Sequence, residues 1–160
     1  NLAESVHRTG RAEANPGGPA MAHDADQVPV GDAERRPAGE VGDWYRRGLA
    51  LLDSGDAAAA ATVLRHARDA APEARSVAEA LARALYDAGA YGEATDVFAQ
   101  LSAADPADDY ALFGWGRSAL ASGDARSAAQ RLALAAAMRP SNSSYAAALR
   151  SARHALGIAS

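Results

Sequence analysis

The sequence predicts an all-α fold in which helical hairpins stack into a right-handed solenoid of about seven helices. Two observations lead to this prediction. Glycines in short turns and prolines both recur at an interval of 34 residues. The glycines are Gly55, Gly89 and Gly123, and the prolines are Pro72, Pro106 and Pro140. A fixed period of this length is typical of arrays in which each repeat is one helical hairpin.

These recurring glycines and prolines also mark where each helix begins and ends. A turn glycine accepts the left-handed conformation that terminates a helix, and a proline cannot continue one. Asp56 and Asp124 follow two of the turns and are suited to cap the next helix. The pattern therefore predicts helices over residues 43–54, 57–70, 75–88, 91–104, 109–122, 125–138 and 143–156.

Small and bulky residues also keep the 34-residue register. Small residues recur in the first helix of each hairpin and in the second, where they allow two backbones to approach closely. They are Gly48, Ala82 and Gly116, then Ala60, Ala94 and Ala128. Leu64, Phe98 and Leu132 recur four residues after the second set and are expected to fill the space between hairpins.

These residues resemble the tetratricopeptide repeat family, whose pattern is W-x2-L-G-x2-Y, then A-x3-F, then P. The match covers about residues 41–142 as three repeats, at 41–74, 75–108 and 109–142. It departs from the pattern at the tyrosine, which is absent from all three copies, and at Arg47, where an apolar residue is expected. The resemblance implies a concave groove lined by the first helix of each hairpin, and a role in protein–protein interaction.

The two ends of the chain differ from the repeats. Residues 1–40 are rich in Pro and Gly and poor in bulky apolar residues, which predicts a disordered N-terminal tail. Residues 1–20 precede Met21 and are open to interpretation as an extension foreign to the native protein. The alternative is a tail that folds on a partner or lies in the groove of its own chain. Residues 143–160 are expected to contain a C-terminal capping helix, with an amphipathic membrane helix as the less favoured alternative.

The groove residues are predicted from helical spacing, because residues at i, i+4 and i+7 share one face of a helix. Two arginines in adjacent helices suit a carboxylate, and aromatic rings supply contact area. The candidate peptide-binding residues are Tyr45, Leu49, Leu52, Glu79, Arg83, Tyr86, Tyr110, Phe113, Arg117 and Leu120. The competing interpretation is that the aromatic rings pack between helices and that Arg83 pairs with Glu79 on its own helix.

Composition excludes several other classes. The net charge of −4 argues against nucleic-acid binding, and no apolar run approaches the roughly 18 residues that span a membrane. Sixteen basic residues, all arginine, with abundant Ala and Gly, indicate a bacterial source. The chain has no Cys, and none of its four histidines lies three or four residues from another, so neither a metal site nor a cofactor is expected. With no secretion signal, we expect a cytoplasmic location.

We therefore expect a scaffold or adaptor, not an enzyme, that binds a partner protein or peptide with an acidic side chain or a C-terminal carboxylate. No catalytic constellation stands out in the sequence. Two alternatives stay open: a self-associating structural module, and a regulatory subunit of an enzyme complex.

Overall fold

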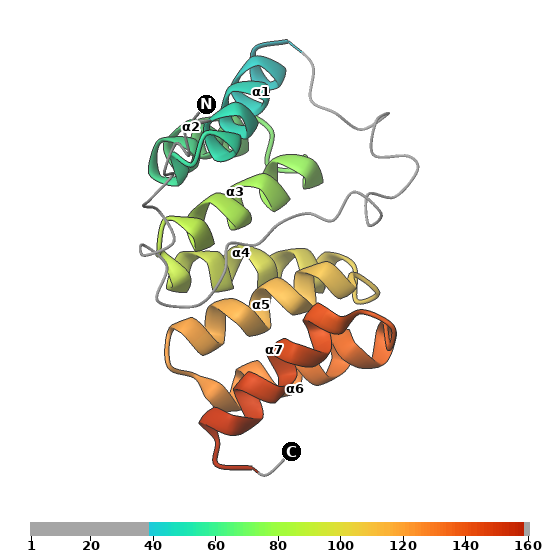
Figure 1. Ribbon diagram of the computed structural model, residues 1–160. Helices are drawn as coiled ribbons and strands as arrows, with labels where there is room; N and C mark the ends of the chain where they lie inside the picture. Colours follow the sequence, from blue (N-terminus) through green and yellow to red (C-terminus); the bar gives the residue numbers. More distant parts are fainter. Residues whose placement is uncertain (1–38, 159–160) are drawn as a thin grey trace, which may run out of the picture.

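The computed structural model describes residues 39–158, and within them the chain forms seven helices and no strand (Figure 1). Their bounds are α1 Gly39–Asp53, α2 Ala57–Ala70, α3 Arg75–Asp87, α4 Tyr91–Ala104, α5 Asp109–Ala121, α6 Ala125–Met138 and α7 Ser143–Ala155. Each helix packs against the next one along the chain. This arrangement confirms the predicted solenoid of helical hairpins.

The helices form two layers. The odd-numbered helices also contact one another in order, α1 with α3, α3 with α5 and α5 with α7. Figure 1 shows these four helices following one another down the molecule. We call the surface that they form the inner face, and the surface over α2, α4 and α6 the outer face.

The turns have the predicted chemistry. Gly55, Gly89 and Gly123 have φ values of 84°, 81° and 91°, in the left-handed region that other residues enter at a steric cost. Asp56 Oδ1 accepts a hydrogen bond from the Ala59 amide at 3.1 Å, and Asp124 Oδ1 accepts one from the Ser127 amide at 3.0 Å. Both aspartates are therefore N-caps, as their positions predict.

The helix bounds agree with the prediction to within one residue, except at the start of α1. That helix begins at Gly39, four residues before the predicted start and inside the predicted tail. Glu40 lies in its first turn, where a carboxylate interacts favourably with the exposed amides. The rest of the predicted tail, residues 1–38, lies outside the described residues, so its disorder stays a prediction.

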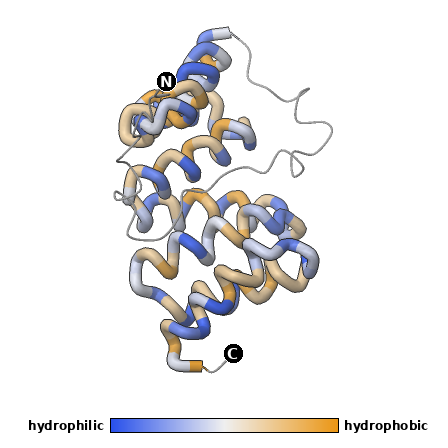
Figure 2. The backbone as a smooth tube through the Cα atoms, in the orientation of Figure 1, coloured by the Kyte–Doolittle hydropathy of each residue, from blue (hydrophilic) through white to orange (hydrophobic). Residues whose placement is uncertain are grey.

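Close approach of the paired helices explains the recurring small residues. The Leu64, Phe98 and Leu132 side chains are completely buried. A Cβ atom on Gly48 would lie 2.5 Å from the Leu64 side chain, and one on Gly116 would lie 2.5 Å from Leu132. Along every helix the apolar residues alternate with polar ones, as expected of helices with one buried face (Figure 2).

The last helix covers the end of the third hairpin, as the predicted capping helix should. Tyr145 and Ala152 are buried and Leu149 is half-buried, whereas Leu156 lies just past the helix end and is exposed. Arg150 stands 34 residues after Gly116, at the position where two helix backbones meet in the first and third hairpins, and it is exposed. A large charged side chain there prevents another helix from packing in the same way, which suits a capping helix.

Candidate functional site

The ten predicted groove residues all lie on the odd-numbered helices, but they differ in exposure. Six of them are half-buried and accessible from outside: Tyr45, Leu49, Glu79, Arg83, Arg117 and Leu120. The other four are buried: Leu52, Tyr86, Tyr110 and Phe113. The inner face therefore combines an accessible set of charged and apolar side chains with an aromatic layer beneath it.

The aromatic layer involves four helices, α3, α4, α5 and α7. The rings of Phe113 on α5 and Tyr145 on α7 stack with centroids 4.6 Å apart and an interplanar angle of 25°. Tyr110 lies 6.5 Å from Phe113 and meets Phe98 of α4 edge-on at 6.1 Å. Tyr86 of α3 meets Tyr91 edge-on at 5.3 Å. The Phe113–Tyr145 stack joins α5 to α7, and the edge-on pairs join α3 and α5 to α4. Such ring contacts constrain both the distance and the orientation of the helices.

Arg117 is held at the point where α3 and α5 meet. Its Nη2 donates a hydrogen bond to the Tyr86 hydroxyl oxygen at 2.6 Å. Its guanidinium carbon lies 5.3 Å from the centroid of the Tyr86 ring and 5.8 Å from that of Phe113, within the range of a cation–π interaction. These contacts hold the cation in one position at the inner face.

Arg83 has a different partner from the one considered from the sequence. Its Nε lies 3.9 Å from Asp87 Oδ2 and, within the described residues, has no hydrogen-bond acceptor although it is buried. Glu79 is instead bound by Arg75, whose Nε donates to Glu79 Oε1 at 2.8 Å. The ion pair of Arg83 is thus with Asp87, and that of Glu79 is with Arg75.

Two ion-pair clusters at the ends of the odd-numbered helices were not found from the sequence. Arg75 at the start of α3 binds Asp105 at 3.3 Å and Asp108 at 2.6 Å, in addition to Glu79. Asp109 at the start of α5 accepts bonds from Arg139 and from the Tyr145 hydroxyl, both at 2.8 Å.

These two clusters are equivalent in the repeat but have opposite charges. The pairs Arg75–Asp105 and Asp109–Arg139 both span 30 residues and lie 34 residues apart. Comparing positions across repeats for complementary charge would have found them.

Burial and these contacts change the ionisation of the inner-face residues. Burial raises the pKa of the Tyr86 hydroxyl, although Arg117 opposes the change. Burial likewise raises the pKa of Tyr110 and of Tyr145, and at Tyr145 the bond to Asp109 adds to the effect. Their phenol groups are therefore neutral at physiological pH. The Tyr145 hydroxyl donates to Asp109, and the Tyr86 hydroxyl accepts from Arg117.

Burial and ion pairing have opposite effects on the pKa values of Arg75 and Asp108. Burial alone would lower the pKa of Arg75, but the carboxylates of Asp108, Glu79 and Asp105 outweigh it and the pKa is raised. Burial raises the pKa of Asp108, while the bond from the Ala111 amide and the charge of Arg75 act in the opposite direction. This cluster joins α3 to the turn before α5 and is a structural contact between repeats.

Among residues 39–158, no group of three or more His, Asp or Glu side chains is placed to hold a metal ion. In the same range, no helix has the length and apolar character needed to cross a membrane.

The stacked hairpins define a helical-repeat protein. Residues 51–113 match the family model of the tetratricopeptide repeat. Among solved structures, "MamA RS-1 ArsTM double mutant" is similar, with 21% identity, a TM-score of 0.69, and coverage of 77% of this chain and 69% of that one. No curated protein of similar sequence was found.

Two further structures extend the comparison. The first tetratricopeptide domain of human RPAP3 is 17% identical with a TM-score of 0.66, and the match covers 73% of this chain and 92% of that domain. MamA from Desulfovibrio magneticus RS-1 is 20% identical with a TM-score of 0.64, covering 74% and 72%. Residues 51–113 thus match the tetratricopeptide repeat, and the chain has the fold of solved tetratricopeptide structures. Repeats of this family generally bind other proteins and do not catalyse reactions.

Proposed function

We propose that this protein is an adaptor whose inner face holds an extended or helical peptide segment of a partner protein. The observation that carries the proposal is the fixed position of Arg117, between the Tyr86 hydroxyl and the Phe113 ring. A cation that is already ordered loses little conformational entropy when it binds a carboxylate, which favours affinity.

Neighbouring side chains give the partner its other contacts. Arg83 lies on α3 one turn before Tyr86, so both cations reach the same part of the inner face. Tyr45 and Leu49 on α1 and Leu120 on α5 are half-buried and offer apolar surface on either side of the arginines. The complementary ligand has apolar anchors and an acidic side chain or a C-terminal carboxylate between them.

The predicted location of the protein rests on its sequence, and the predicted chemistry of its partner rests on the inner-face contacts. A cytoplasmic location and the absence of nucleic-acid and membrane partners stay predictions. The contact residues are likewise proposed, with the buried aromatic layer supporting the two arginines instead of presenting its rings to the ligand.

The proposal is tested by selecting peptides on the full-length chain from a random library with free C-termini. We expect the selected sequences to be enriched in acidic residues, or to share an apolar motif directly at their free C-terminus. Arg83→Glu with Arg117→Glu should weaken binding of such a peptide by about tenfold or more, or ~1.4 kcal/mol, because it replaces attraction with repulsion. Fluorescence anisotropy with a labelled peptide measures this change.

A control must change the charge equally without touching the inner-face pair. Arg47 and Arg126 are both exposed, so Arg47→Glu with Arg126→Glu should leave peptide affinity within about twofold of wild type and the fold intact. Equal weakening by both double variants would show a general charge effect and would remove the specific role of Arg83 and Arg117. Far-UV circular dichroism confirms that each variant is folded.

A further inference from the structure

The charge of this protein is divided along the solenoid. Residues 39–124 contain fourteen acidic residues and seven arginines, whereas residues 125–158 contain five arginines and no acidic residue. The first two hairpins and α5 are therefore acidic and the end formed by α6 and α7 is basic. Figure 1 shows α6 and α7 at one end of the molecule, with α1 and α2 at the other.

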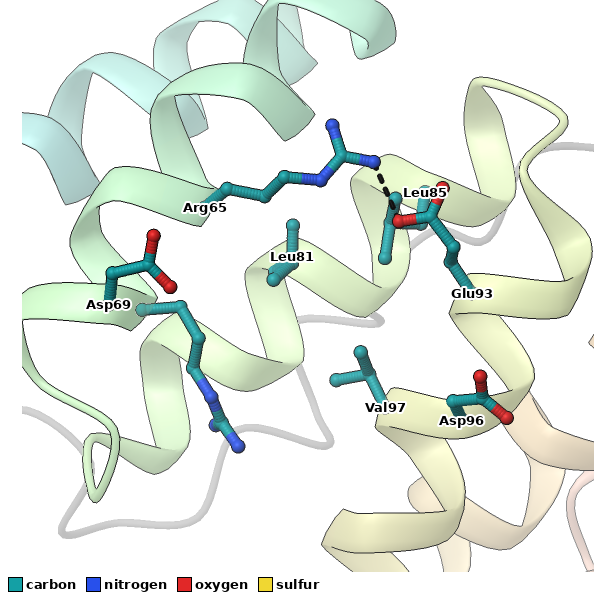
Figure 3. A pocket seen from close by; sticks show the side chains of 8 residues that line it. Arg65, Asp69, Leu81, Leu85, Glu93, Asp96 and Val97 are labelled. Carbon is teal, nitrogen blue, oxygen red and sulfur yellow. Dashed lines mark hydrogen bonds and ion pairs between the residues drawn. The ribbon is translucent and has the colours of Figure 1, made fainter.

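The acidic part contains a pocket on the side of α3 away from the peptide-binding residues. It has a volume of about 240 Å³ and is lined by α2, α3 and α4. Leu81 and Leu85 form its apolar floor together with Val97 (Figure 3). Both leucines are two residues from Arg83 in sequence, which places them on the opposite side of the helix from the inner face.

The rim of the pocket is charged. Arg65 reaches across it, and its Nη2 donates to Glu93 Oε2 at 2.8 Å (Figure 3). Arg68 donates to the amide oxygen of Gln100 at 3.3 Å. The exposed carboxylates of Asp69 and Asp96 remain at the rim, where they can bind a cation from outside. The volume is below the roughly 300–1,000 Å³ of small-molecule sites, so the pocket suits a single apolar side chain flanked by a basic one.

The opposite end of the same chain presents those two features together. Leu156 and Ile158 are 37% and 52% exposed, although both are large and apolar. The exposed Arg150 and Arg153 precede them on the last two turns of α7. We call Arg150, Arg153, Leu156 and Ile158 the tip. The rim of the pocket carries three carboxylates and two guanidinium groups, and is therefore net acidic. An exposed apolar pair beside basic side chains complements such an apolar pocket.

We propose that the tip of one copy docks into the pocket between α2, α3 and α4 of a second copy. Leu156 or Ile158 covers the floor formed by Leu81, Leu85 and Val97, and Arg150 and Arg153 face Asp69 and Asp96. Within one copy the pocket lies over α2, α3 and α4, whereas the tip lies beyond α5 and α6 at the C-terminal end of the solenoid, so the contact forms between molecules (Figure 1). Such a head-to-tail contact leaves one free surface at each end and extends into chains or closes into a ring. Neither surface includes a peptide-binding residue, so the inference is independent of the proposed adaptor function.

The test is sedimentation velocity of the full-length chain over a range of concentrations at low and at high salt. We expect the weight-average mass to rise to at least about twice the 16.4 kDa of one chain at low salt, and to fall when salt screens the charges. Arg150→Glu with Arg153→Glu, and separately Asp69→Arg with Asp96→Arg, should each give a monomer. An equimolar mixture of the two variants should assemble again, because the reversed charges complement one another.

Several outcomes would overturn the proposal. They are a wild-type monomer at every concentration and salt level, assembly of either charge-reversed variant like wild type, or failure of the mixture to assemble. The Arg47→Glu/Arg126→Glu variant has the same charge change as the tip variant and should still assemble, so its loss of assembly would also count against the contact. Binding of the wild-type monomer to vesicles of anionic lipid, lost in the tip variant, would assign the tip to a membrane surface instead.

Discussion

Replacing Phe98 with alanine is expected to lower the free energy of unfolding by about 3–5 kcal/mol, the largest effect among single substitutions considered for this chain. The Phe98 ring is completely buried in the central hairpin and meets Tyr110 edge-on at 6.1 Å. It also fills the space above Gly114 on α5. Removing the ring leaves a cavity between the second and third hairpins and removes an aromatic contact that spaces them.

The effect is measured by urea unfolding followed by far-UV circular dichroism. Leu134→Ala is the control, because Leu134 is 49% exposed on α6 and its truncation should change stability by about 0.5 kcal/mol or less. If the two variants unfold at the same urea concentration, Phe98 does not join the hairpins in the way that its contacts indicate.

Gly114→Ala is expected to destabilise the protein by about 1–3 kcal/mol, although alanine is normally the better helix former. A Cβ atom at this position would lie 2.3 Å from Cε1 of Phe98, closer than atoms can approach. The ring has no room to move because it is buried on every side. The steric cost should therefore exceed the gain of about 1 kcal/mol that alanine brings to a helix.

A double-mutant cycle tests this explanation. In a Phe98→Leu background the steric conflict is relieved, and Gly114→Ala should then become neutral or stabilise by up to about 1 kcal/mol. Gly92 is the matched control, since it lies in α4 and a Cβ there would contact nothing within 4 Å. Gly92→Ala should be neutral or stabilising in both backgrounds. A Gly114→Ala penalty that persists unchanged with Leu at position 98 would contradict the close approach of α4 and α5.

Most of the fold could be predicted from the sequence because its main determinants are local. A turn glycine, an N-cap and a proline each act within a few residues, and the 34-residue period repeats them three times. The start of α1 was missed for the same reason. Gly39 and Gly42 read locally as loop residues, but Gly39 begins the helix and Gly42 is buried within it.

The inner face was harder to predict because it depends on contacts between helices. Helical spacing placed Tyr86, Tyr110 and Phe113 on the odd-numbered helices, but spacing alone does not reveal how deeply a ring is buried between neighbours. The partner of Arg83 illustrates the same limit. Both Glu79 and Asp87 lie four residues away, and the structure pairs Arg83 with Asp87 and Arg75 with Glu79.

The contacts between repeats needed the period and the charges together. The pairs Arg75–Asp105 and Asp109–Arg139 join equivalent positions with their signs exchanged, so neither repeat alone shows a pattern. Gly114 has no counterpart in the 34-residue glycine set, because Ala80 and Ala148 occupy its equivalent positions. The contact with Phe98 explains why glycine stands at position 114, because the Phe98 ring is larger than its counterparts Leu64 and Leu132.

The most direct test of the adaptor function is photo-crosslinking from single positions of the full-length chain in lysate. A benzophenone amino acid at Leu49 lies on the inner face, and one at Leu134 lies on the exposed side of α6. We expect a covalent adduct with a partner protein from position 49 but not from position 134, and its loss when Arg83 and Arg117 are both changed to glutamate. Adducts that form from position 134 and not from position 49 would contradict a peptide-binding inner face.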